Sequence, residues 1–135
     1  MGEIRVKVRL TNAADEALAR RGNLAADQVH WVETDALIDT GAVRSVIPQS
    51  LLAPLGVAVR GQRTAEYADG RTEQVGVTEP LIFELLGRDT PEETLVLGDE
   101  VLIGQTVLGK LDLLADCVRQ RLVPAHAEGA LSKVK

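Results

Sequence analysis

The strongest constraint on the fold is a strict alternation of apolar and charged residues near the start of the chain. Ile4, Val6, Val8 and Leu10 alternate with the charged residues at 3, 5, 7 and 9. A period of two is typical of a β-strand with one buried face. Further short apolar runs follow, bounded by Gly, Pro, Asn or Asp, and together they predict an all-β domain. The expected strands cover residues 3–10, 29–38, 57–67, 72–78, 80–86, 94–97, 101–103 and 118–123.

Three short helices are expected among these strands. Asn12 is a good N-cap for a helix over 12–21, and Pro48 can open another that runs through residue 52 and ends at Pro54 and Gly56. Apolar residues at 107, 108, 111, 114 and 115 have a helical period, which predicts a helix over 105–115. Residues 87–91 are expected to form a turn.

Composition limits the class of protein. The chain has 135 residues, the size of one domain, with 45% apolar but only 2% aromatic residues, so its core must be aliphatic. A net charge of −5 without a basic run argues against nucleic acid as a partner. The chain has no leader-like or membrane-spanning apolar run, so we expect a cytoplasmic protein with no membrane partner. The expected organisation is a single domain over 1–124 and a loose C-terminal tail over 125–135.

The run from Leu37 to Ala42 carries a candidate chemistry. Hydrolysis of a peptide bond by water needs a base to activate the water and an acid to protonate the leaving group. Two close carboxylates can do both, because they share one proton. Asp39 could supply such a carboxylate at the end of an apolar strand. Gly41 permits a close backbone approach, and the Thr40 hydroxyl can hold two loops together.

Three separate segments resemble the retropepsin family of aspartic proteases. They are residues 37–42 followed by Ser45, the hairpin at 67–70, and the apolar-apolar-Gly segment at 101–104. The similarity is closest to small bacterial single-domain proteins of clan AA. It implies a closed β-barrel with a short C-terminal helix, a peptide or protein substrate, and no cofactor or metal. It also implies catalytic roles for Asp39, Thr40 and Gly41 and substrate contacts from Ala42, Tyr67, Ala68, Asp69, Gly70 and Ile103.

Stoichiometry adds an independent expectation. The chain contains a single Asp-Thr-Gly and no second Asp-Thr-Gly or Asp-Ser-Gly. A two-fold homodimer supplies the second Asp39 without further sequence. An endopeptidase of this kind should therefore be a homodimer with its site on the symmetry axis. The segment 11–28, which precedes the catalytic strand, could serve dimerisation or substrate contacts.

Two other classes of protein fit the same residues. One is a catalytically inert dimeric module on the same fold, with a peptide-binding or structural role. The other is a plain β-domain in which Asp39-Thr40-Gly41 is only a turn. Glu33, Asp35 and Asp39 share a strand face, but Leu37 interrupts them and no His completes a metal site.

The remaining reactive residue types have structural explanations. Cys117 is expected to be a buried thiol, and Trp31 a core residue that could reach a substrate pocket. His30 and His126 lack partners at metal-ligand spacing, which favours surface or packing roles.

Overall fold

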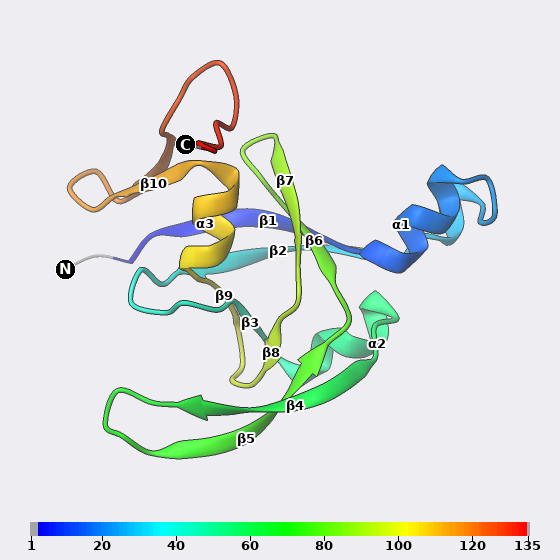
Figure 1. The fold of residues 1–135 in the computed structure, drawn as a ribbon, viewed down its shortest axis with the longest axis horizontal. Coiled ribbons are helices and arrows are strands. Elements are labelled where there is room, and N and C mark those ends of the chain that lie inside the picture. Colours follow the sequence, from blue (N-terminus) through cyan, green and yellow to red (C-terminus); the bar gives the residue numbers. More distant parts are fainter. Residues whose placement is uncertain (1–2, 135) are drawn as a thin grey trace.

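The computed structural model describes residues 3–134, which are mostly β-structure with a few short helices (Figure 1). One sheet of nine strands curls around a single core, and a separate two-stranded sheet lies near the C-terminus. The strands are β1 (Arg5–Asn12), β2 (Trp31–Ile38), β3 (Val46–Ile47), β4 (Val59–Glu66), β5 (Thr72–Thr78), β6 (Leu81–Leu85), β7 (Arg88–Glu92), β8 (Leu95–Val96), β9 (Val101–Ile103), β10 (Leu113–Asp116) and β11 (Arg121–Pro124). The helices are α1 (Ala13–Arg20), α2 (Leu52–Leu55) and α3 (Gln105–Leu111), with 3₁₀ turns η1 (Ala26–Gln28) and η2 (Gln49–Leu51).

The order of strands in the large sheet is β4-β5-β8-β3-β9-β2-β1-β6-β7. Most neighbours are antiparallel, but β2 pairs in parallel with β9, and β3 with β8. The chain therefore passes through the centre of the sheet twice, once over 31–47 and once over 95–103. These two passages bring the end of β2 and the end of β9 together, with Ile38 opposite Ile103.

The core is aliphatic, as the composition predicts. Val8 and Leu10 of β1 are fully buried, which confirms the alternating strand at the start of the chain. Phe83 is the single phenylalanine and is also fully buried. Helix α3 contributes Val107, Leu108 and Leu111 to this core. The sheet is open, with β4 and β7 as its edges, and burial of this apolar surface is the main force that keeps it curled around the core.

Several local predictions are confirmed. The Asn12 side chain accepts a hydrogen bond from the backbone N–H of Asp15 at 3.1 Å, so it caps α1. Strand β5 has the predicted bounds 72–78, and Gly70 turns the chain with a φ of +88°. A helix follows the apolar segment 101–103, although it is shorter than expected.

The predicted helix over 105–115 ends early. Asp112 adopts the left-handed conformation with a φ of +56°, and residues 113–116 continue as strand β10. The apolar residues at 114 and 115 therefore extend the helical pattern by coincidence. The final strand begins at Arg121, not 118, because the β10–β11 turn occupies the residues before it. Cys117 lies in that turn and is exposed, so the prediction of a buried thiol is wrong.

Two predictions about turns and helix ends are also wrong. Residues 88–92 form the edge strand β7, and the turn before it consists of Leu86 and Gly87, which have φ values of +52° and +78°. Two residues with positive φ make the tight turn that best fits a hairpin. Pro54 lies inside α2, where a first-turn proline loses no hydrogen bond, and Gly56 ends the helix.

Candidate functional site

Asp39 directly follows β2, at the point where the chain leaves the core. Its backbone N–H donates to the carbonyl of Ile103 at 2.9 Å. Ile103 is fully buried, so this bond ties the start of the loop to the core of the sheet. Asp39 itself is half-buried. Ile103 thus supports the loop from below and does not contact the open space above it.

The Asp39 carboxylate is oriented by its own loop. The backbone N–H of Gly41 donates to Asp39 Oδ1 at 3.0 Å, and the N–H of Ala42 donates to the Asp39 carbonyl at 3.2 Å. These bonds form a tight turn of the kind that Asp favours. A Cβ atom at position 41 would lie 3.4 Å from Asp39 Oδ1, so glycine leaves the carboxylate open to approach.

The second central passage of the chain clamps the rest of the loop. The backbone N–H groups of Gln105 and Thr106 donate to the carbonyls of Ala42 and Val43 at 2.9 and 3.0 Å. The Gln105 side chain also donates to the carbonyl of Thr40 at 2.6 Å. This clamp was not predicted from the sequence, because no pattern in residues 105 and 106 indicates which distant carbonyls they meet.

Gly104 and Ser45 complete the clamp. Ser45 is fully buried, and its Oγ accepts a hydrogen bond from the Gly104 N–H at 3.0 Å. A Cβ atom at Gly104 would lie 2.7 Å from the carbonyl oxygen of Arg44, so the two passages touch backbone to backbone. Both residues belong to the segments that carry the resemblance, but only the structure shows that they bind each other.

A cavity of about 610 Å³ lies over Asp39, between its loop and the β4–β5 hairpin. Among the predicted site residues, Asp39, Gly41, Ala42, Tyr67 and Ala68 line it. The other four predicted site residues do not line this cavity: Thr40, Asp69, Gly70 and Ile103. The lining residues that sequence reasoning missed are mostly apolar, with two arginines and one glutamate: Val43, Arg44, Val46, Arg63, Thr64, Ala65, Glu66, Leu95, Leu97 and Leu102.

The turn of the β4–β5 hairpin is shaped by its own polar groups. Gly70 N–H donates to the Tyr67 carbonyl at 2.9 Å, and Tyr67 N–H to the Arg71 carbonyl at 2.8 Å. The Asp69 carboxylate accepts hydrogen bonds from the backbone N–H and from the side chain of Arg71. Both bonds lower the pKa of Asp69, and the backbone bond has the larger effect. Asp69 and Gly70 therefore build the turn and do not face the cavity.

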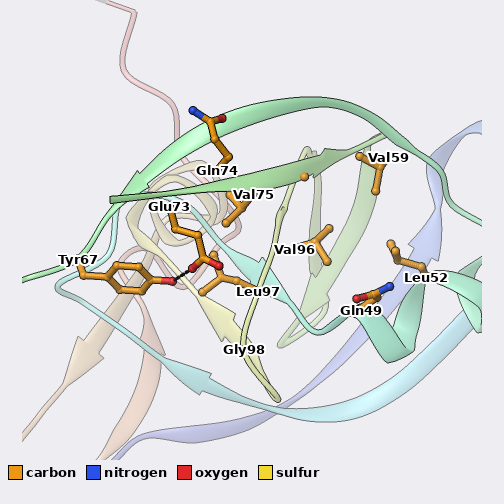
Figure 2. A pocket seen from close by; sticks show the side chains of 11 residues that line it. Gln49, Leu52, Val59, Tyr67, Glu73, Gln74, Val75, Val96, Leu97 and Gly98 are labelled. Atoms are coloured by element: carbon orange, nitrogen blue, oxygen red, sulfur yellow. Dashed lines mark hydrogen bonds between the residues drawn. The ribbon is translucent and has the colours of Figure 1, made fainter. Parts of the chain in front are cut away.

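A second cavity of about 450 Å³ lies beside the same hairpin (Figure 2). Tyr67 and Leu97 line both cavities, so the two spaces adjoin at these side chains. The Tyr67 hydroxyl donates to Glu73 Oε1 at 2.5 Å, and this hydrogen bond raises the pKa of Tyr67. Figure 2 shows this pair at one end of the cavity and Gln49, Leu52 and Val59 at the other.

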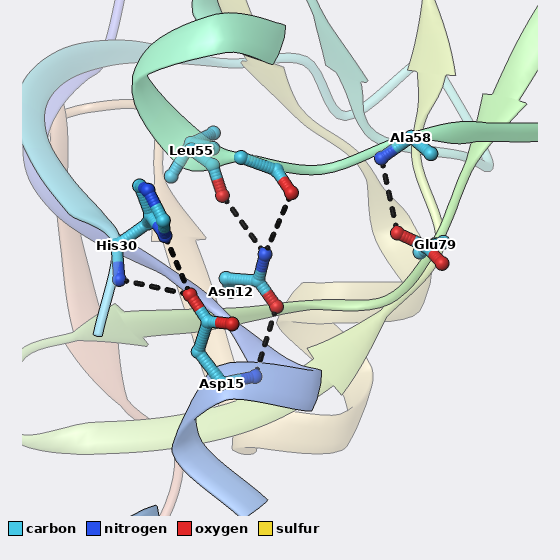
Figure 3. A network of polar contacts seen from close by, with 7 residues as sticks. Asn12, Asp15, His30, Leu55, Ala58 and Glu79 are labelled. Atoms are coloured by element: carbon cyan, nitrogen blue, oxygen red, sulfur yellow. Dashed lines mark hydrogen bonds and ion pairs between the residues drawn. The ribbon is translucent and has the colours of Figure 1, made fainter. Parts of the chain in front are cut away.

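The segment 11–28 is anchored away from Asp39. Asn12 Nδ2 donates to the carbonyls of Leu55 and Gly56, at 2.9 and 3.1 Å (Figure 3). The Asp15 carboxylate binds the ring and the backbone N–H of His30. Burial acts to raise the pKa of Asp15, but the hydrogen bonds from His30 outweigh it and lower the pKa. In Figure 1, α1 lies at the opposite end of the molecule from the loop between β2 and β3.

Other residues considered from the sequence lie outside both cavities. Trp31 is 49% exposed and stacks against Arg9, whose guanidinium lies 4.1 Å from the ring, so its predicted place in the core is wrong. Asp35 is exposed and pairs with Lys7 at 3.3 Å. Within residues 3–134, no group of three His, Cys, Asp or Glu side chains is arranged to hold a metal ion.

The arrangement offers one oriented carboxylate at the floor of a cavity with a hairpin above it. A single carboxylate can act as a base or as an acid, but it cannot do both in one step. No protein-family model matches the chain, and no curated protein sequence matches it. Among the described helices, none is long and apolar enough to cross a membrane.

Proposed function

We propose that the protein is an aspartic endopeptidase of the retropepsin type, active as a homodimer. The observation that carries the proposal is the placement of Asp39. Its carboxylate is held by the Gly41 N–H at the floor of the large cavity, and the β4–β5 hairpin covers that cavity. The curled sheet is the counterpart of the family's closed barrel, and the hairpin at 67–70 is the counterpart of its flap.

The proposed reaction uses two copies of Asp39. Two carboxylates near the two-fold axis share one proton, because like charges at that distance do not both ionise. The ionised carboxylate takes a proton from water as the water attacks the peptide carbonyl. The protonated carboxylate supplies the proton that the leaving nitrogen needs. The peptide or protein substrate would lie in the cavity, under the hairpin, and the reaction needs no cofactor.

The residues around Asp39 fit supporting roles in this reaction. Thr40 is exposed next to the carboxylate, with its carbonyl held by Gln105, so its hydroxyl can bond the loop of a second copy. Gly41 and Ala42 line the cavity, where their backbone can meet substrate. The Gly104 clamp would keep two such loops rigid enough to face each other across the axis.

The test is a comparison of wild-type protein with Asp39→Asn and Asp35→Asn on a library of peptides. Asparagine keeps the shape of the loop but cannot act as a base, so cleavage should fall by roughly 10²- to 10⁴-fold or more. Asp35→Asn removes the same charge from an exposed position within β2, the strand that leads into Asp39, and should keep most of the activity.

Two results would overturn the proposal. One is cleavage that survives Asp39→Asn in purified protein. The other is a wild-type dimer that binds peptides and cleaves none of them, which would indicate the inert binding module instead.

A further inference from the structure

The second cavity adjoins the cavity over Asp39. Tyr67 and Leu97 form a common wall, so a chain bound over Asp39 can place a neighbouring side chain in the second space. In an extended peptide, successive side chains point to opposite sides and alternate ones share a side. One bound peptide can therefore fill both cavities, and the second one would receive a side chain at a fixed distance from the scissile bond.

The two cavities differ in charge. The cavity over Asp39 is lined by two acidic residues, Asp39 and Glu66, and two basic ones, Arg44 and Arg63. These charges balance, and most of the other lining residues are apolar, which suits an apolar side chain. The second cavity is lined by one carboxylate, Glu73, and by no basic residue. Its charge therefore favours a cation.

The walls of the second cavity combine aliphatic and polar groups. Leu52, Val59, Val75 and Val96 give it aliphatic surface, while Gln49 lies at one end and Glu73 at the end nearest Tyr67 (Figure 2). Lysine and arginine bury a long aliphatic stem and keep the charge at its end. A stem along the valines would bring such a charge to Glu73.

Glu73 has an oxygen to offer to such a cation. The Tyr67 hydroxyl bonds Oε1 of Glu73, and a carboxylate has further acceptor positions on its second oxygen. The nearby Arg71 is engaged elsewhere: its Nε binds Asp69 at 2.8 Å, and its guanidinium stacks over the Tyr67 ring at 4.8 Å. Tyr67 thus holds Glu73 in place without neutralising it.

We infer that the second cavity is a specificity pocket for a lysine or arginine side chain of the substrate, with Glu73 as the residue that selects it. This inference rests on the proposed endopeptidase function. The substrates of the protein would be peptides with an apolar residue near the scissile bond and a basic residue at a fixed number of positions from that bond.

The experiment compares matched peptides that differ only at one position, with lysine, methionine or glutamate there. A peptide library cleaved by the wild-type protein identifies the position. The measured quantity is the ratio of kcat/KM for the lysine peptide to that for the methionine peptide. We expect a ratio of about three to ten for the wild type, typical of a partly exposed charge pair.

Three variants test the role of Glu73. The ratio should fall to about one in Glu73→Gln, and Glu73→Lys should prefer the glutamate peptide. Glu84→Gln is the control, because Glu84 is exposed on β6, lines neither cavity and carries the same charge. It should keep the wild-type ratio. A lysine preference that persists in Glu73→Gln, or cleavage without any basic preference, would overturn the inference while the endopeptidase proposal stands.

If no peptide is cleaved, a measurement of peptide binding tests the specificity pocket separately from the endopeptidase function. Fluorescence anisotropy of the same labelled peptides with Asp39→Asn protein measures affinity without turnover. The lysine peptide should bind about three to ten times more tightly than the methionine peptide, and the difference should vanish in the Asp39→Asn, Glu73→Gln double variant. Equal affinities would overturn the specificity pocket by themselves.

Discussion

At the scale of single residues, Gly104 matters for the space it leaves. Its φ of −98° suits any amino acid, so conformation does not demand glycine there. Glycine is required because of Arg44 and Val43, whose backbone atoms would lie 2.7 to 2.9 Å from a Cβ atom added at position 104. Backbone atoms cannot move aside as a flexible side chain can, and they belong to the loop that carries Asp39.

Gly104→Ala should therefore destabilise the protein by about 1–3 kcal/mol, the usual cost of overpacking a well-filled site. Urea unfolding measures the change. The matched control is Gly109→Ala, since an added Cβ at position 109 meets nothing within 4 Å and lies inside α3. Alanine there should add about 0.5–1 kcal/mol of stability, because glycine is a poor helix residue. Equal effects of the two substitutions would contradict the close backbone contact.

At the scale of elements, the C-terminal end of α3 organises the last segment of the chain. Asp112 ends the helix in the left-handed conformation, and its carboxylate binds the ring of His126 at 2.6 Å and the N–H of Leu131 at 3.2 Å. Arg88 of β7 donates to the carbonyls of Leu111 and Asp112, both at 3.0 Å. Part of the segment 125–135, expected to be a loose tail, is thus fastened to the helix end through His126 and Leu131.

This contact predicts a pH dependence of stability. The hydrogen bond with His126 is the largest cause that lowers the pKa of Asp112 below its ordinary value. A carboxyl group with a lowered pKa stabilises the folded protein above the pKa of the unfolded chain, about 3.9. That contribution is lost as the pH falls through the lower pKa of the folded state.

The comparison is between wild-type protein and Asp112→Asn. Asparagine also accepts the left-handed conformation, so the helix end should persist while the charge is lost. The wild type should be the more stable of the two at pH 6, and the difference should shrink as the pH falls below about 4. Urea midpoints across this range measure it. Asp89→Asn, an exposed charge on β7, is the control, and a difference for Asp112→Asn that does not change with pH would contradict the argument.

The sequence was informative where an element depends on its own residues. The Asp69-Gly70 turn, the Asn12 cap and the alternating strand β1 all follow from local chemistry, and the structure has each of them. Strand β7 was missed because Asp89, Thr90 and Pro91 have the composition of a turn. It is an edge strand, and an edge tolerates proline because one side of its backbone needs no partner.

The clamp on the Asp39 loop could not be predicted from local patterns. Ser45 and Gly104 are 59 residues apart in the sequence. Their hydrogen bond exists only because strands from 31–47 and from 95–103 alternate at the centre of the sheet. The same holds for Glu73, which is one exposed charge among many in the sequence. Its neighbours in the second cavity come from four separate segments, and only the fold brings them together.

At the scale of the whole molecule, three turns lie at one end. Figure 1 shows the β2–β3 loop, the β4–β5 turn and the β10–β11 turn at the end opposite α1. Exposed apolar side chains belong to this end, with Val43 at 65% and Val118 at 94% exposure. A second copy that covers this end would bring two Asp39 loops together, as the proposed reaction requires.

A dimer of this kind predicts a concentration-dependent melting temperature, since association stabilises the folded state by mass action. Val43→Asp places a charge in the proposed interface and should increase the dimer dissociation constant at least about tenfold, with a parallel loss of cleavage. Analytical ultracentrifugation measures the first effect. Leu86→Asp is the control, because Leu86 is 55% exposed in the β6–β7 turn, away from the loop. A wild-type protein that stays monomeric at high concentration would exclude the proposed mechanism.

The pairing of the segments 31–47 and 95–103 at the centre of the sheet has a consequence for the timing of folding. The Asp39 loop is held by partners 59 and 65 residues further along the chain, so local folding cannot organise it. Contacts between such distant residues form slowly, because a long loop must close before they give any gain. We expect a chain still being synthesised to carry an unorganised Asp39 loop until residues 101–106 have left the ribosome. The geometry on which any activity of Asp39 depends would therefore be acquired only after residues 101–106 have been made and have folded against the loop.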